Sequence, residues 1–154
     1  FTSLPYVINE LTKAGANGFT LFNRFYQPDF DIENLEVKPN IILSNSNDTR
    51  LAMRWIAILH SRITTSIAAS SGVHSAEDAI KYLMAGADIV MVASTLLQNG
   101  IGQLKTILKD LNAWMEEREY NSLDEMIGSL SQKAVPNPAA FERALYLKEL
   151  QSYR

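Results

Sequence analysis

Apolar residues recur along the chain with two different spacings, which predicts helices and strands in turn. Segments with apolar residues three or four positions apart alternate with short, continuous apolar runs. The order of helix then strand occurs about three times, which is typical of parallel βα units, and such apolar strands must be covered on both faces. The expected helices are 4–14, 48–61, 76–86 and 102–118, and the expected strands are 18–25, 64–70 and 88–92.

An insertion interrupts this alternation after the first expected strand. Residues 26–46 contain two extended stretches, with Lys38-Pro39-Asn40 as the expected turn between them. Proline and asparagine are typical turn residues. The pattern therefore predicts a hairpin that is inserted into the first βα unit.

The C-terminal residues follow a different pattern from the rest of the chain. Residues 1–120 are expected to form the βα part, and residues 121–154 a helical extension. Ser122 and Glu125 have the spacing of a capping box, which predicts one helix there. A further helix is expected from Asn137 to the terminus.

Two architectures suit parallel βα units. A doubly wound sheet would suit the length of 154 residues, whereas small residues at the strand ends favour a (βα)8 barrel with a phosphate held after its last two strands. A complete barrel needs at least about 200 residues, so three strands cannot close one. We therefore expect a partial (βα)8 TIM barrel, cut from a longer protein because the chain does not begin with methionine. A missing N-terminal barrel half or a homo-oligomer would cover its open edges.

Composition and charge narrow the classes of partner. The chain is 47% hydrophobic and 20% charged, as in ordinary globular proteins. Its net charge is -3, and its basic residues are scattered, which argues against nucleic acid as a partner. The absence of cysteine excludes disulfides and thiolate metal sites, and no metal site is expected. No apolar run approaches the roughly 20 residues that span a bilayer, so we expect no membrane partner and a cytoplasmic location.

Small residues follow two of the expected strands. Ser70, Ser71 and Gly72 come after the second strand, and Ala93 and Ser94 come after the third. Backbone N–H groups at a helix N-terminus attract anions, and small side chains would let phosphate oxygens reach the amides of Ser71 and Gly72, with the serine hydroxyls as extra donors. The alternative is that these residues only form tight turns before a helix cap.

Three stretches of the chain resemble the C-terminal part of the dihydroorotate dehydrogenases. They are residues 18–35, 68–100 and 108–130. The resemblance implies an FMN-dependent barrel, of which this chain supplies the sixth to eighth strands, and a role in pyrimidine biosynthesis. The whole protein would oxidise dihydroorotate to orotate or catalyse a related CH–CH oxidation, with a small-molecule substrate.

The resemblance also assigns residues to the FMN phosphate and to the substrate. Family members usually have glycines where this chain has Ser71 and Ala93, so this mode of phosphate binding is expected to survive only if neither position needs a positive φ. Asn23 matches the asparagine that hydrogen-bonds the pyrimidine. The next residue, Arg24, is usually serine or threonine, and its guanidinium could bind a substrate carboxylate, bind the cofactor phosphate or leave the site.

No catalytic residue is expected within this chain. In the family the catalytic cysteine or serine and the lysine near the flavin precede the part that begins at Phe1. His60 is expected to cap a helix, and His74 to be either a solvated turn residue or a donor to the phosphate. The alternatives are a non-catalytic half-barrel remnant with a phosphate-binding or protein-interaction role, and another barrel enzyme that acts on a sugar phosphate.

Overall fold

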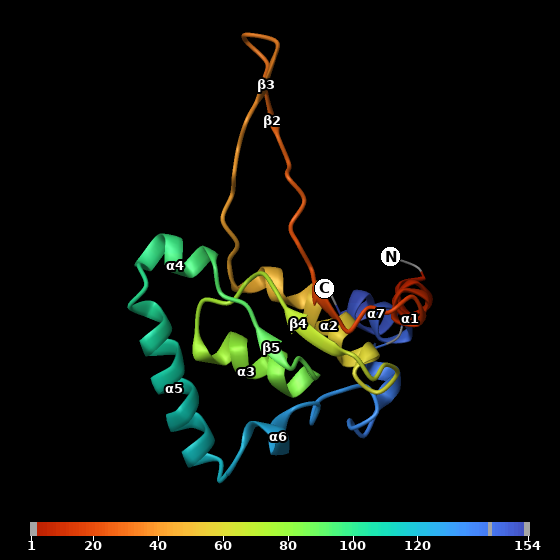
Figure 1. Ribbon diagram of the computed structural model, residues 1–154. Coiled ribbons are helices and arrows are strands. Elements are labelled where there is room, and N and C mark those ends of the chain that lie inside the picture. Colours follow the sequence, from red (N-terminus) through yellow and green to blue (C-terminus); the bar gives the residue numbers. More distant parts are fainter. Residues whose placement is uncertain (1–2, 142, 153–154) are drawn as a thin grey trace.

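A computed structural model describes residues 3–141 and 143–152 of the chain, and it has an α/β fold (Figure 1). The strands are β1 (Gly18–Leu21), β2 (Asp29–Asp31), β3 (Glu36–Lys38), β4 (Ser66–Ala69) and β5 (Ile89–Val90). The helices are α1 (Leu4–Lys13), α2 (Thr49–Leu59), α3 (Ala76–Ala85), α4 (Ser94–Asn99), α5 (Gln103–Glu117), α6 (Leu123–Met126) and α7 (Arg143–Ser152), with 3-10 turns at Ser46–Asp48 and Pro138–Phe141.

Three strands form a parallel sheet in the order β1-β4-β5. Leu21 lies opposite Ala69, and Ala69 lies opposite Val90, so the three strands end at one edge. The expected parallel order is confirmed, but each strand is shorter than its apolar run. Within the described residues, β1 and β5 each have a strand neighbour on one side only. Ile89 in β5 and Met91 just after it are 55% and 46% exposed.

The core lies where β4 meets α2 and α3. Ile67 of β4, Ile56 of α2 and Tyr82 of α3 are each 1% exposed or less. A second cluster joins α3 to α5 and α6 through Leu83, Leu111 and neighbouring side chains. The residues that follow β4 and β5 therefore lie next to helices that are packed into these two clusters.

A long hairpin projects from the body after β1 (Figure 1). We call residues 25–43 the arm. Its strands β2 and β3 are antiparallel, with Phe30 opposite Val37, and its turn lies at residues 32–35. The expected turn at residues 38–40 is wrong, because the Asp31 side chain accepts hydrogen bonds from the N–H groups of Glu33 and Asn34 and so closes the turn earlier.

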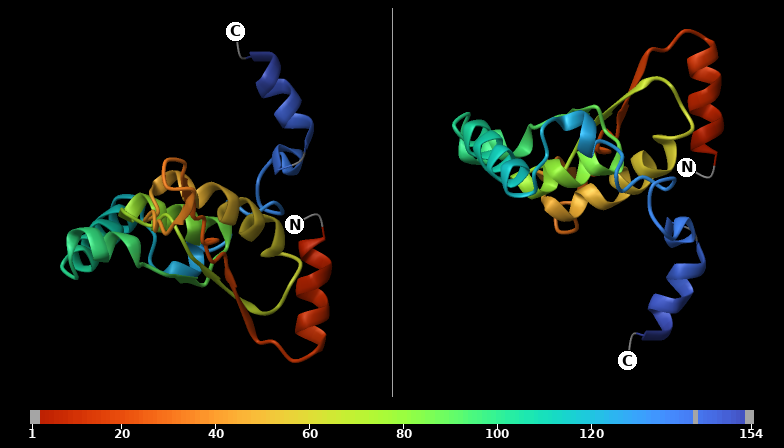
Figure 2. Two further views of the ribbon diagram at one scale, coloured as in Figure 1. Left: turned by 90° about the horizontal axis from the view of Figure 1, so that it is seen from above. Right: turned by 90° about the horizontal axis from the view of Figure 1, so that it is seen from below.

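The helix boundaries follow only some of the local signals. The capping box of Ser75 and Asp78 is confirmed, and α3 ends at Gly86 with φ +120°. The expected helix after Ser122 is confirmed as α6, with Ser122 as the N-cap residue. The expected capping box is wrong, because the Ser122 side chain makes no cap hydrogen bond and Glu125 instead accepts from the N–H of Asn121 at 2.8 Å. The C-terminal extension contains α6, the 3-10 turn at Pro138–Phe141 and α7, and α7 extends away from the sheet (Figure 2).

Candidate functional site

One cleft of about 220 Å³ opens where the parallel strands end. It gathers Asn23, Arg24 and the small residues that follow the second and third expected strands, but not His74. Because β1, β4 and β5 run in the same direction, their carboxyl ends bring these residues together. The cleft is lined by Asn23, Arg24, Ser44, Ser70, Ser71, Gly72, Val73, Met91, Val92, Ala93 and Ser94.

The turn after β4 has an unusual backbone. Ser71 and Gly72 have φ of +80° and +79°. A residue with a side chain loses about 1–2 kcal/mol in this region. Ser71 thus adopts the conformation that glycine would take at lower cost, whereas Ala93 has φ -134° and needs no glycine. The condition that neither position needs a positive φ therefore holds at Ala93 and fails at Ser71. Serine nevertheless adopts the turn, at the cost of stability, and its backbone N–H group is retained.

Backbone N–H groups that follow β4 and β5 are free to donate hydrogen bonds. Within residues 3–141 and 143–152, no acceptor is found for the N–H of Ser71, Gly72, Ala93 or Ser94. The Ser71 hydroxyl is buried and has no partner among the described residues. The expected role of the serine hydroxyls as extra donors stays a prediction.

Ser44, which directly follows the arm, lines the cleft and was not predicted from the sequence. It is 3% exposed. Its N–H donates to Ser94 Oγ at 3.1 Å, and the two hydroxyl oxygens lie 2.8 Å apart. The two residues are 50 positions apart, so no local spacing could have paired them. This contact fixes the orientation of the Ser94 hydroxyl at the cleft wall.

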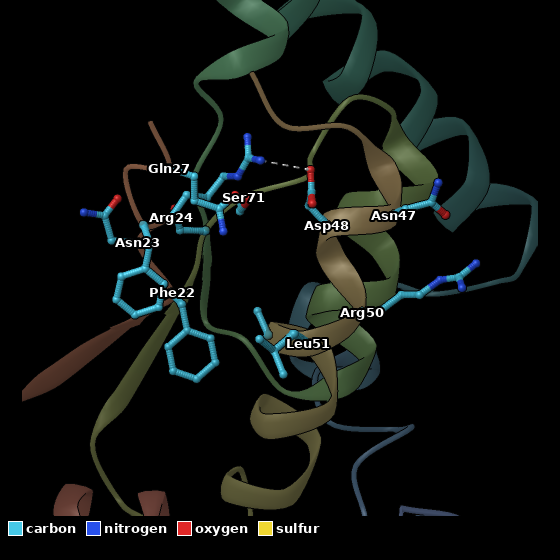
Figure 3. A pocket seen from close by; sticks show the side chains of 12 residues that line it. Phe22, Asn23, Arg24, Gln27, Asn47, Asp48, Arg50, Leu51 and Ser71 are labelled. Carbon is cyan, nitrogen blue, oxygen red and sulfur yellow. Dashed lines mark ion pairs between the residues drawn. The ribbon is translucent and has the colours of Figure 1, made fainter. Parts of the chain in front are cut away.

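Arg24 remains in the site. Its Nη1 donates to the carbonyl of Ile42 at 2.5 Å, and its Nη2 lies 3.9 Å from Asp48 Oδ2. Arg24 is the one cationic side chain among the residues that line the cleft, and the alternative that it leaves the site is wrong. It also borders a second pocket of about 380 Å³, in which Arg24 faces Asp48 and Leu51 from the opposite wall (Figure 3).

The N-terminus of α3 is already occupied. Asp78 Oδ2 accepts hydrogen bonds from the N–H groups of His74 and Ser75, both at 3.0 Å, and from Ser46 Oγ at 2.8 Å. A carboxylate thus sits where an anion would meet the helix dipole. The amides of Ser71 and Gly72, where the sequence places the anion, precede α3, which begins at Ala76. Anion binding at these two amides stays a prediction.

The two histidines have different surroundings. His60 is the C-terminal cap residue of α2, as expected, and its Nδ1 lies 3.2 Å from the carbonyl oxygen of Gly86. His74 Nε2 is buried without a partner among the described residues, so the expectation of a solvated turn residue is wrong. His74 is also absent from the lining of the cleft, which leaves no contact to support a role at a phosphate.

The Asp78 carboxylate should make the free energy of unfolding decrease as the pH falls into the acid range. Burial alone would raise its pKa, but the hydrogen bonds from His74, Ser46 and Ser75 outweigh burial and hold the pKa below the ordinary 3.8. The stabilisation is therefore complete above the unfolded pKa and is lost as pH falls through the lower folded value. Asp78→Asn should lower the free energy of unfolding by about 1–3 kcal/mol near neutral pH.

Urea denaturation at a series of pH values measures this effect. The difference between wild type and Asp78→Asn should shrink once the pH falls below about 4. Asp110→Asn, an exposed position on α5, is the matched control and should change stability by less than about 0.5 kcal/mol. A difference that stays constant down to the lowest pH would contradict the proposed role of the Asp78 charge.

The described residues offer neither a metal site nor a membrane span. No group of three histidine, cysteine, aspartate or glutamate side chains among them could hold a metal ion. None of the described helices has the length and apolar character that a membrane span requires.

Comparison with known proteins gives consistent matches. The family model described as dihydroorotate dehydrogenase matches residues 42–115. The catalytic subunit of dihydroorotate dehydrogenase B (NAD(+)) from Methanothermobacter thermautotrophicus is 27% identical over 134 residues, which cover 82% of this chain and 43% of that protein. The corresponding subunit from Thermoplasma acidophilum is 26% identical over 126 residues, which cover 79% of this chain and 42% of that protein.

A solved structure shows the same fold. The ligand-free dihydroorotate dehydrogenase of Eimeria tenella matches with a TM-score of 0.64 at 17% identity, over 80% of this chain and 35% of that one. The chain thus spans about two fifths of the length of the curated relatives that it matches.

Proposed function

We propose that the chain is the C-terminal part of an FMN-dependent oxidoreductase of the dihydroorotate dehydrogenase family, and its matches to members of that family support the proposal. On this proposal β1, β4 and β5 are the sixth, seventh and eighth strands of a (βα)8 barrel, and the cleft at their ends binds the FMN phosphate. The observation that carries it is the convergence of residues after all three strands on one cleft with unpaired backbone donors.

The residues of the cleft fit a phosphate group. The free N–H groups of Ser71 and Gly72 supply directed hydrogen bonds, and Arg24 supplies positive charge. A phosphate accepts several hydrogen bonds at once, and charge-assisted ones are about twice as strong as neutral ones. The Ser94 hydroxyl, held by Ser44, adds a further donor on the opposite wall. FMN, once bound, would supply the redox chemistry of hydride acceptance.

Asn23 is proposed to orient the substrate. It is exposed at the end of β1 and lines the cleft, and its carboxamide can both donate and accept, as recognition of a pyrimidine edge requires. Dihydroorotate or a related molecule that undergoes CH–CH oxidation is the proposed substrate. Arg24 follows Asn23, so a carboxylate on the substrate would compete with the phosphate for the same guanidinium.

Catalysis is proposed to need more of the protein than this chain. Hydride transfer to a flavin needs a base for the accompanying proton, and the residues that line the cleft include no cysteine, lysine or histidine. The exposed edges of β1 and β5 are where a further barrel half or a second copy would pair. The cytoplasmic location expected from the sequence stays a prediction.

Flavin titration tests the proposal. Quenching of flavin fluorescence should show that this chain, or the longer protein that contains it, binds FMN more tightly than riboflavin by about tenfold or more, because riboflavin lacks the phosphate. Arg24→Gln should weaken FMN binding by about fivefold to tenfold and leave riboflavin unchanged.

Arg50→Gln is the matched control for this titration. Arg50 points from α2 away from Arg24, and its loss changes the net charge equally (Figure 3). It should leave the preference for FMN intact. Failure of the wild-type protein to prefer FMN would refute the proposed site and would favour the non-catalytic remnant.

A further inference from the structure

Tyr82 contacts the cleft wall from behind. It lies on α3, its side chain is 0% exposed, and it is not among the residues that line the cleft. Its hydroxyl lies 2.9 Å from the carbonyl oxygen of Ser71 and 3.3 Å from that of Ser70. Since carbonyl oxygens only accept, the hydroxyl donates to both. A single buried donor therefore holds two consecutive carbonyl groups.

These two hydrogen bonds fix the direction of the amides that the anion would meet. In a planar trans peptide the N–H group points opposite to the preceding C=O group. Drawing the carbonyls of Ser70 and Ser71 toward Tyr82 therefore turns the N–H groups of Ser71 and Gly72 away from α3. These are the same N–H groups that have no acceptor among the described residues.

The turn needs such support because its conformation is unfavourable. Ser71 has a φ of +80°, which for a residue with a side chain is less stable than a right-handed alternative. Loss of the hydroxyl would leave buried carbonyl groups unpaired and would remove what opposes rotation of these peptide planes. Burial, with Asp78 and Asp48 as further causes, raises the pKa of Tyr82, so the hydroxyl keeps its proton.

We propose that Tyr82 is a positioning residue for the anion site, and that its hydroxyl aims the backbone amides of Ser71 and Gly72 at a phosphate in the cleft. The inference rests on the proposed function, since it concerns the same site. It assigns to Tyr82 a role in selecting phosphorylated over unphosphorylated flavin, in addition to its packing in the core.

Tyr82→Phe tests this role, since it keeps the ring and removes the hydroxyl alone. The affinity for FMN should fall by about fivefold to tenfold, while the affinity for riboflavin stays unchanged. In amide NMR spectra, inorganic phosphate should shift the Ser71 and Gly72 signals of the wild type and shift them much less in the variant. Tyr120→Phe is the matched control, because Tyr120 stacks on Trp114 in a different part of the fold, and it should change neither readout.

The outcomes separate the two proposals. If the wild type shows no preference for FMN and no response to phosphate, the proposed function is refuted. If the wild type shows both and Tyr82→Phe keeps the same ratio of FMN to riboflavin affinity, only the role of Tyr82 is refuted. An equal loss of affinity for both flavins would show general loosening of the fold and would also refute the positioning role.

Discussion

Replacing Gly86 with alanine should lower the free energy of unfolding by roughly 3–5 kcal/mol. Gly86 ends α3 with φ +120°, which disfavours any side chain. A Cβ at this position would also lie 2.3 Å from His60 Cγ and 2.5 Å from His60 Cβ. The His60 Cβ is fixed by the backbone at the end of α2 and cannot rotate away, so the two helices would have to separate.

Gly15→Ala is the control for this prediction. Gly15 follows α1 with φ +105°, and a Cβ there would meet nothing within 4 Å. Gly15→Ala should lower the free energy of unfolding by only about 1–2 kcal/mol, which is the cost of a side chain at a positive φ. Urea denaturation followed by circular dichroism measures both variants. Equal losses would contradict the His60 contact. In the His60→Ala background the extra loss at Gly86 should become smaller but persist, because alanine keeps the Cβ that would lie 2.5 Å away.

Gly72→Ala should impair both stability and the anion site. A Cβ on Gly72 would lie 2.7 Å from the backbone nitrogen and from Cγ2 of Thr49, and 3.1 Å from the carbonyl oxygen of Asn45. The turn would have to move away from the start of α2, and the Ser71 and Gly72 amides would move with it. We expect a loss of roughly 2–4 kcal/mol in unfolding free energy and the disappearance of the preference for FMN over riboflavin.

Gly100 provides a closely matched comparison. It has φ +80°, against +79° for Gly72, and a Cβ there would meet nothing within 4 Å. Gly100→Ala should therefore lose about 1–2 kcal/mol and keep the preference for FMN. If Gly72→Ala kept that preference as well, the turn after β4 would not be the phosphate site.

Local patterns in the sequence predicted the parts of this structure that depend on neighbouring residues. Continuous apolar runs located β1, β4 and β5, and the parallel order placed Asn23, Ser71 and Ser94 at one edge. The runs overestimated strand length because pairing stops after Leu21 and Val90. Residues beyond these points, such as Phe22 and Val92, leave the sheet and border pockets instead.

Long-range contacts account for what the sequence did not reveal. Ser44 reaches Ser94 across 50 residues, and Ser46 reaches Asp78 across 32. The spacing of Ser75 and Asp78 predicted a helix cap, but it could not show that the Asp78 carboxylate also binds the 3-10 turn before α2. Because that carboxylate occupies the N-terminus of α3, we place the proposed anion site on the preceding turn.

Hydrogen bonds at both ends of the arm connect it to residues that line the cleft. At its base Arg24 binds the carbonyl of Ile42, and just beyond it Ser44 binds Ser94. A ligand that engages Arg24 or Ser94 acts on the same groups that set the direction in which the arm projects. Suppose that a second molecule binds the arm and that its affinity depends on the direction of the arm. Thermodynamic reciprocity then requires that the ligand in the cleft and this second molecule change each other's affinity by the same factor.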